Sequence, residues 1–314
     1  MAHRSSFHFF NKIGESLWRT RNNAYRSHYN IGFVEDDIHD VLKASRLEIK
    51  WMKHPYKSRW FADPQLLSVN DREIVVLVEE FSYDTSIGRI AKLVVRRSDY
   101  SLQDMKIILD LPTHLSFPFI FRKDGDVYLM PENSQAETTS MYRYNIQTDE
   151  LTKCSDVTRL PLTDAIITEM TDGKEYVLST KEPDANKDEL QIYAFDSKAL
   201  TIDDQPVQTI RFDSNIARNA GEVFEVDDVK YRPAQDCNKC YGNGIVLQRL
   251  EYTDGKFSLT DVNMFHSDYF HMDLGYHTFN VMNGLIVVDG HGHNNMWMYK
   301  TVRLFGKLKR LVRR

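Results

Sequence analysis

Three acidic residues, Asp63, Glu132 and Asp164, lie far apart in the sequence but close to strand-like segments of similar pattern. Chemistry at a glycosidic bond needs such carboxyl groups, because one must stay protonated as an acid while another stays ionised as base or nucleophile. We therefore predict that these three residues form a catalytic carboxylate set. The alternative is structural: Asp and Glu at strand ends also cap turns and hydrogen-bond to neighbouring strands.

Further polar side chains occupy corresponding places along the chain, and we predict that they bind substrate. They are Glu79, Glu80, Arg218, Arg232, Gln235, His277 and Asp289. Arg232 follows an apolar strand-like segment, and its guanidinium can clamp a phosphate or carboxylate through two parallel hydrogen bonds. A salt bridge from Arg232 to one of the acidic residues is the competing interpretation.

Metal-binding patterns are incomplete. Cys237 and Cys240 form a single CxxC pair, which is half of a zinc site, and a tight turn is the better interpretation. His291 and His293 lie close to Asp289, but their spacing matches no common metal motif; His271 and His277 are the nearest further candidates. We predict no metal site, and the sequence does not identify a cofactor.

The elements that must position these residues repeat along the chain. Paired apolar segments recur five times, with aligned starts at Asp63, Pro118, Asp164, Gly221 and Thr278, at steps of 55, 46, 57 and 57 residues. Repeats of short strands at such spacing are typical of propeller blades. The sequence therefore predicts an all-β protein with five blades, whose innermost strands face one axial pocket.

The last repeat is short of strands, so an N-terminal strand must complete it. Residues 29–34 or 47–51 are the candidates, and residues 36–43 read as a short helix or loop. We expect a helical extension over residues 1–28, a propeller over 29–297 and a basic amphipathic helix over 298–314.

Charge is distributed unevenly. Residues 298–314 carry seven Lys/Arg and no acid, and residues 1–30 carry five Lys/Arg and one Glu, so the total of −5 leaves −16 for the segment between them. An acidic body argues against nucleic acid as a partner. The basic C-terminal segment suits an anionic membrane surface, although it could also dock on the acidic body.

The cellular compartment is predicted from the signals that the sequence does not show. No apolar run reaches 18 residues, the apolar run at residues 7–10 is too short for a signal peptide, and the three cysteines suggest no disulfide framework. We expect a cytoplasmic protein held at the inner face of the membrane.

Six segments in order also resemble a known family. They are residues 60–64 (WFADP), 114–121 (HLSFPFIF), 128–133 (YLMPEN), 163–165 (TDA), 231–236 (YRPAQD) and 275–278 (GYHT). Together they resemble the propeller domain found N-terminal in plant glucosamine inositolphosphorylceramide transferases, and similar domains in bacterial polysaccharide-synthesis proteins. The resemblance implies a five-bladed propeller similar to arabinanase and invertase glycosidases. It places Asp63, in its Asp-Pro pair, in the acid/base set, with Asp164 and Glu132 as looser matches. The plant proteins carry a separate transferase domain, which is not recognisable in this chain.

These observations predict a carbohydrate-active protein, most simply a glycosyltransferase-type enzyme of surface polysaccharide or glycolipid synthesis. Its partners would be a sugar nucleotide or a lipid-linked saccharide. A non-catalytic module that binds a glycan or sugar nucleotide beside a separate transferase is the first alternative, and a glycoside hydrolase is the second.

Overall fold

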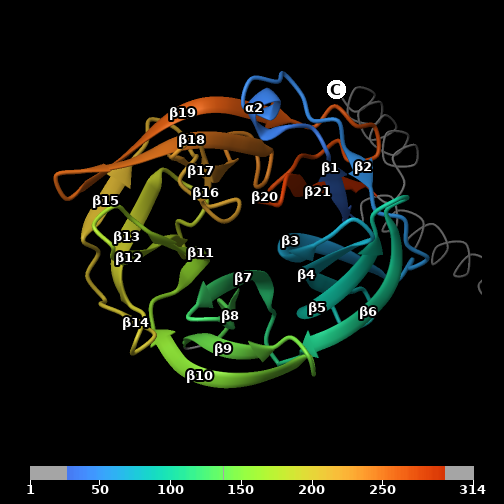
Figure 1. Ribbon diagram of the computed structural model, residues 1–314, viewed down its shortest axis with the longest axis horizontal. Coiled ribbons are helices and arrows are strands. Elements are labelled where there is room, and N and C mark those ends of the chain that lie inside the picture. The colour runs from blue at the N-terminus through green and yellow to red at the C-terminus, as the bar shows by residue number, and fades with distance from the viewer. Residues whose placement is uncertain (1–26, 137, 294–314) are drawn as a thin grey trace, which may run out of the picture.

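The computed structural model describes residues 27–136 and 138–293, and it is a ring of five antiparallel sheets around a central axis (Figure 1). The predicted all-β, five-bladed propeller is confirmed. Within the described residues one short helix, α2 (Ile38–Val41), accompanies the strands. The predicted helical extensions lie outside the described residues.

Each blade is an antiparallel meander with its first strand nearest the axis. Blade one is β3 (Arg59–Val69), β4 (Glu73–Ser82), β5 (Ile87–Arg96) and β6 (Ser101–Leu109). Blade two is β7 (Ser116–Lys123), β8 (Asp126–Glu132), β9 (Thr139–Asn145) and β10 (Glu150–Thr158). Blade three is β11 (Leu162–Glu169), β12 (Glu175–Lys181), β13 (Glu189–Asp196) and β14 (Thr201–Ile202), with β15 (Gln208–Arg211) also paired to β13. Blade four is β16 (Phe224–Val226), β17 (Val229–Asp236), β18 (Gly244–Thr253) and β19 (Lys256–His266).

Blade five closes the ring with strands from both ends of the chain. Its order is β2 (Lys50–Trp51), β1 (Ser27–Val34), β21 (Leu285–His293) and β20 (Phe279–Met282). Both predicted closing segments take part, although only the last two residues of the predicted strand 47–51 form β2. Eight cross-strand pairs join β1 to β21, from Ser27 opposite His293 to Val34 opposite Ile286.

The first strands of blades one, two and three share one irregularity. The ladder slips at the same place in β3, β7 and β11, and the residue there has a positive φ: 52° at Asp63, 39° at Phe117 and 44° at Asp164. Asp tolerates the left-handed region better than most residues, whereas Phe rarely adopts it. Such bulges re-aim side chains.

The hydrophobic core lies between adjacent blades. Ile31 and Phe33 of blade five, for example, pack with Phe61, Val76 and Leu93 of blade one. The strands alternate buried faces, so each blade covers its two neighbours and none can bury its apolar surface alone.

Candidate active site at the propeller axis

Most of the predicted site residues lie on one face of the ring. First strands begin on this face and second strands end on it, because the two run antiparallel. Asp63 and Asp164 lie in the first halves of β3 and β11, while Glu79 and Glu132 lie in the second halves of β4 and β8. We call this the site-bearing face. We define the axial site as Asp63, Glu79, Glu132, Asp164, Arg218, Gln235, His277 and Asp289.

One half of the axial site joins blade one to blade five. The carboxylate of Asp289 lies 2.6 Å from Nδ1 of His277 and accepts a hydrogen bond of 2.9 Å from the backbone N–H of Asp63. Asp63 in turn accepts from the N–H of Phe117 (3.0 Å) and from the hydroxyl of Thr278 (3.1 Å). Both bulge residues, Asp63 and Phe117, are therefore held by hydrogen bonds that cross blade boundaries.

The other half joins blades two, three and four. Arg218 Nε donates to Asp164 Oδ2 at 2.6 Å, and the side-chain amide of Gln235 donates to the same oxygen at 2.8 Å. Glu132 accepts from the backbone N–H of Asp164 at 2.9 Å and lies 3.5 Å from a terminal nitrogen of Arg218. Asn186, from the β12–β13 loop, accepts a further Arg218 hydrogen bond at 3.0 Å.

Electrostatics separates the protonation states of these carboxyl groups. Burial raises the pKa of Asp63 to about 6, against the opposing attraction of His277. Burial and the neighbouring Asp164 raise the pKa of Glu132 to about 8, although Arg218 opposes the shift. Burial and the neighbouring Asp63 raise the pKa of Glu79 well above its usual range. The axial site therefore holds protonated and ionised carboxyl groups together at neutral pH.

His277 is the cationic counterpart in the first half of the site. Burial lowers its pKa, but Asp289 and Asp63 outweigh burial and raise the pKa of the imidazole to about 9. The charge of His277 in turn holds the pKa of Asp289 below its usual value, although burial acts in the opposite direction. His277 and Asp289 thus form a buried ion pair at neutral pH.

Two predicted substrate-binding residues lie outside the axial site. Glu80 follows Glu79 on β4, so its side chain points to the other face of the strand, where it pairs with Arg59 (2.9 Å) and Arg89 (2.8 Å). Arg232 is fully buried, and its guanidinium donates to Asn219, Gln248 and the Ala217 carbonyl. Protein acceptors thus occupy Arg232, and of the two predicted arginines only Arg218 contacts the carboxylates of the axial site.

Several side chains at the axial site were not singled out from the sequence. Tyr241 lies between two cations: its ring centre is 4.9 Å from the Arg218 guanidinium and 5.3 Å from the His277 ring, and the residue is 36% exposed. Tyr29 of β1 stacks on His277 at 4.9 Å. The only sequence signal for Tyr241 was its position just after Cys240, in a segment interpreted simply as a turn.

His114 reaches the site from the loop before β7. Its Nδ1 accepts from the Gly88 N–H at 3.0 Å, so Nε2 carries the ring proton, 3.3 Å from Oε1 of Glu79. Burial lowers the pKa of His114, which keeps the ring neutral. His114 therefore lies against the Glu79 carboxyl without adding a charge.

Among the described residues, one group of ligand-type atoms is close enough for a metal ion: oxygen and nitrogen atoms of Asp63, His277 and Asp289 lie within 4.8 Å of one another. The same atoms make the ion pair between His277 and Asp289, so a metal ion there would have to displace the proton of the imidazole. Cys237 and Cys240 are free thiols, buried and exposed respectively. No helix among the described residues is long and apolar enough to cross a membrane.

This chain is similar to curated plant proteins and to solved structures. Two curated relatives are "Glucosamine inositolphosphorylceramide transferase 1" of Oryza sativa subsp. japonica, 29% identical over 217 residues, and the protein of that name from Arabidopsis thaliana, 29% identical over 201 residues. The matches cover 67% and 62% of this chain, but only 29% and 26% of the relatives. The chain thus spans less than a third of their length.

Among solved structures, a GH43 β-xylosidase/α-arabinofuranosidase from a compost microbial metagenome superposes with a TM-score of 0.52 at 15% identity, covering 74% of this chain and 86% of that one. At this identity the likeness concerns the fold. The family described as "Glucosamine inositolphosphorylceramide transferase 1, N-terminal" matches residues 49–275, which include the axial site from Asp63 to Arg218 and Gln235. This protein belongs to that family.

Proposed function

We propose that the axial site handles a saccharide and transfers a glycosyl group, with Glu132 as general acid and Asp63 as general base. One arrangement carries the proposal: Glu132 is largely buried beside a second carboxyl, Asp164, whereas Asp63 lies 3.7 Å from the imidazole of His277, so that the pKa is about 8 at Glu132 and about 6 at Asp63. A pair of titratable groups with divergent environments is the usual arrangement for acid/base work near pH 7.

The step balances as follows. The Asp63 carboxylate takes the proton of an acceptor hydroxyl while that oxygen bonds to the anomeric carbon of the donor sugar. The bond from this carbon to the leaving oxygen breaks, and the Glu132 carboxyl supplies a proton to that oxygen. Arg218 is held at 2.6 Å from Asp164 and offers positive charge beside Glu132. Tyr241, which is partly exposed beside Arg218, offers an aromatic ring for the sugar.

The nature of the substrate is drawn from the relatives. Their name describes transfer of glucosamine to an inositolphosphorylceramide. For this chain we propose a related class: a sugar nucleotide as donor and a lipid-linked saccharide or phosphoinositol headgroup as acceptor.

The test is an assay of the purified chain with labelled sugar nucleotides and detergent-solubilised lipid acceptors. We expect labelled glycolipid to form, and Glu132→Gln to slow its formation about 10²–10⁴-fold, the usual contribution of a general acid. Release of free sugar without acceptor would mean hydrolysis instead. Unchanged turnover by Glu132→Gln would exclude Glu132 as the acid.

A specific observation favours a second candidate, a non-catalytic saccharide-binding module. Asp63, Asp164 and Asp289 are 5%, 3% and 0% exposed, and each accepts hydrogen bonds from the protein itself. Such saturated carboxylates can simply hold the blades together. Calorimetry separates the two: a binding module would bind glycolipid headgroups with no turnover, and Glu132→Gln would leave the affinity within twofold.

A further inference from the structure

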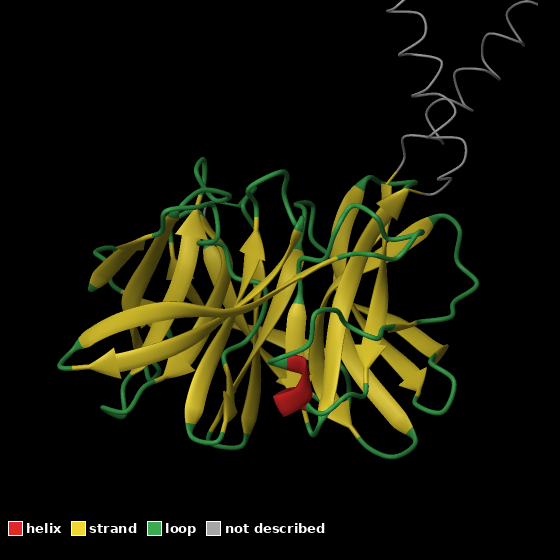
Figure 2. Cartoon of the chain, turned by 90° about the horizontal axis from the view of Figure 1, so that it is seen from above, coloured by secondary structure: helices red, strands yellow, loops and turns green. Residues whose placement is uncertain are grey.

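Both ends of the described chain meet on the site-bearing face. In blades one to four a loop joins the second strand to the third there, but in blade five the second strand, β21, ends at His293 and the third, β1, begins at Ser27. Ser27 and His293 are directly paired. Figure 2 shows the ring from the side, with the chain entering and leaving at one face. Residues 1–26 and 294–314 therefore depart from adjacent points.

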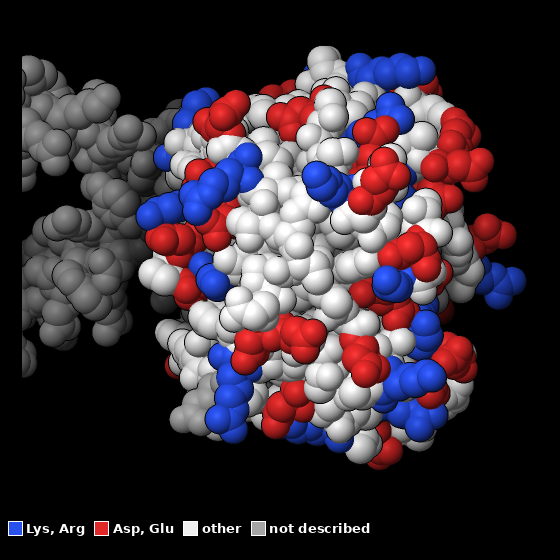
Figure 3. Space-filling model, turned by 90° about the vertical axis from the view of Figure 1, so that its left-hand side faces the viewer, with Lys and Arg blue, Asp and Glu red and all other residues white. Residues whose placement is uncertain are grey.

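These two segments concentrate the positive charge of the protein. Residues 1–26 carry five Lys/Arg and one Glu, and residues 294–314 carry seven Lys/Arg and no acid, so the net charges are +4 and +7. On the side of the ring that Figure 3 shows, by contrast, acidic and basic side chains are mixed. Clustered cations gain about 1 kcal/mol each near an anionic bilayer.

The loop between β19 and β20 lies beside the same place. His271 of this loop presses its carbonyl against Gly292 so closely that no side chain would fit there. The site-bearing face therefore includes this loop next to the end of β21.

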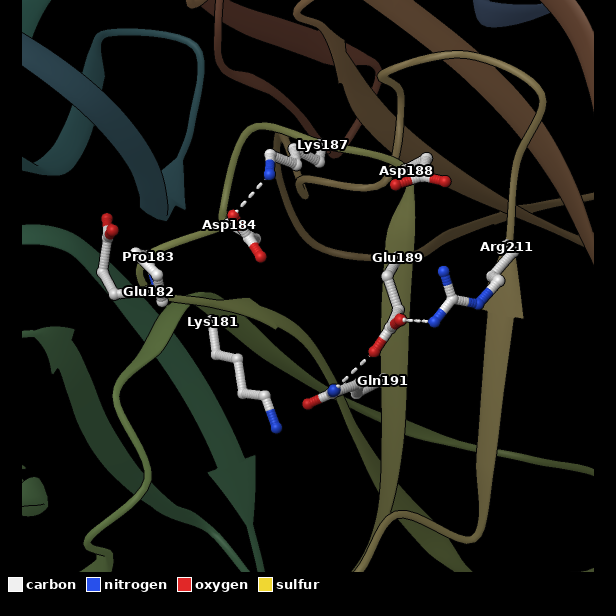
Figure 4. A pocket seen from close by; sticks show the side chains of 9 residues that line it. All are labelled: Lys181, Glu182, Pro183, Asp184, Lys187, Asp188, Glu189, Gln191 and Arg211. Carbon is white, nitrogen blue, oxygen red and sulfur yellow. Dashed lines mark hydrogen bonds and ion pairs between the residues drawn. The ribbon is translucent and has the colours of Figure 1, made fainter.

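The site-bearing face also carries a cavity on blade three. It measures about 310 Å³ and is lined by polar side chains of the β12–β13 loop and of β13 and β15, among them Lys181, Glu189 and Arg211 (Figure 4). Asn186 of this loop holds Arg218. A headgroup at this face would therefore also meet polar groups of blade three.

We propose that the site-bearing face docks on an anionic lipid bilayer, so that the axial site opens toward the headgroups. The two basic segments supply the attraction. A lipid-linked saccharide can then reach Asp63 and Glu132 without leaving the membrane. This inference deepens the proposed function, but docking needs no turnover, so each can fail without the other.

Two native cysteines provide the test of orientation. Cys240 is exposed in the β17–β18 loop of the site-bearing face, whereas Cys154 is exposed on β10 at the outside of the ring. Full-length Cys154→Ser and Cys240→Ser variants each keep one of them. We expect vesicles of 30% phosphatidylserine to slow maleimide labelling of Cys240 at least tenfold and to leave Cys154 within twofold. Vesicles of pure phosphatidylcholine should protect neither.

Charge variants test the source of the attraction. Neutralising Lys307, Lys309 and Arg310 to Gln should weaken vesicle binding roughly 10²-fold, at about 1 kcal/mol for each charge. The matched control neutralises Lys174, Lys198 and Lys256, three exposed lysines in or next to the turns of the opposite face, and should leave binding unchanged.

Several results would overturn the proposal. They are failure to sediment with anionic vesicles, equal protection of both cysteines, and labelling of Cys240 at the free rate while the protein is bound. A lower thermal transition of the Lys307/Lys309/Arg310 variant without loss of lipid binding would show instead that the basic segment docks on the acidic propeller. Turnover on detergent-solubilised acceptor should be unaffected in every charge variant.

Discussion

The same acidic side chain behaves differently at different places around the axis. Asp289 is held ionised by His277 at 2.6 Å, while Glu79, which faces Asp63 and a neutral His114, has its pKa raised well above the usual range. Burial penalises every charge, and a carboxyl group stays ionised only where a cation or several N–H groups compensate. Burial and the neighbouring Asp164 therefore outweigh Arg218 at Glu132, whereas His277 outweighs burial at Asp289.

Replacing the predicted base is the most direct test at the level of residues. Asp63→Asn keeps the shape of the side chain but removes its charge and basicity, so we expect turnover to fall about 10²–10⁴-fold. The fold should persist, because one carbonyl oxygen remains to accept a hydrogen bond. Asp254→Asn, in an exposed turn with φ of 53°, is the control. Full activity of Asp63→Asn would make Asp63 a purely structural residue.

The pH dependence of kcat/KM should be bell-shaped. The rate rises as Asp63 loses its proton near pH 6, and it falls as Glu132 loses its proton near pH 8, so the optimum lies near pH 7. Initial rates of glycolipid formation between pH 5 and 9 check this expectation. In Glu132→Gln the residual rate should keep its acid limb and lose the alkaline one. An alkaline limb that persists in this variant would assign it to another group.

At the level of elements, the repeat was readable from the sequence and the bulges were not. The apolar segments recur because each blade needs the same buried strands, so the pattern predicted the strand pairs of all five blades. The positive φ of Asp63 depends on an N–H that donates to Asp289, 226 residues away, and that of Asp164 on an N–H that donates to Glu132. Local propensity carries no trace of such distant partners. Pro64 even favours an extended backbone for the preceding Asp63.

The candidate site shows the same division. Because equivalent strands point to one axis, their strand-end positions predicted that four residues lie close together, and the structure places them so: Asp63, Glu132, Asp164 and His277. Strand-end position could not separate Arg218 from Arg232, because the amide and carbonyl groups that hold Arg232 come from other strands and a loop. The predicted opening strand of blade four, residues 221–224, also begins only at Phe224, since the preceding segment bends toward the axis to place Arg218.

The junction between blades four and five gives a test of element packing. A methyl group at Gly221 would collide with the carbonyl oxygen of Phe279, a backbone atom that cannot turn away. We expect Gly221→Ala to lower the free energy of unfolding by about 1–3 kcal/mol, the usual cost of overpacking, as measured by urea denaturation. The comparison is Gly255→Ala in an open turn with φ of +76°, which should cost about 1 kcal/mol through backbone strain alone. Equal costs would mean that the junction yields easily.

At the level of the whole molecule, ring closure and the axial site depend on the same strand. Tyr29 lies in β1, which closes the ring, and its ring stacks on both His277 and His291 at 4.9 and 4.2 Å. Opening blade five would therefore remove one wall of the axial site. The two ends of the described chain and the ring closure meet in blade five, which also supplies His277 and Asp289 to the axial site, so we expect local opening of this blade to cost both stability and activity.

Histidines where the chain ends meet should make the stability of the ring sensitive to acid. Burial, together with His54, His271 and His293 nearby, lowers the pKa of His28 from 6.5 to about 4. His28 is therefore protonated near pH 6.5 in the unfolded chain but only near pH 4 in the folded protein. The neutral state of His28 contributes stability above pH 6.5, and this contribution is lost as pH falls toward 4.

Other groups titrate in the same range, so the contribution of His28 must be measured as a difference between variants. Glu132, whose pKa of about 8 lies above its unfolded value, stabilises the fold as pH falls below 8 and opposes the histidine. On going from pH 7.5 to 4.5, the parent protein should lose about 2 kcal/mol more free energy of unfolding than His28→Asn does. His39→Asn, at an exposed histidine whose pKa is raised by Asp37, should not show this gain. Urea denaturation at both pH values measures this difference. If the difference between His28→Asn and the parent is the same at both pH values, His28 takes up its proton in the folded ring as readily as in the unfolded chain. The junction of β1 and β21 would then not make the fold sensitive to acid through His28.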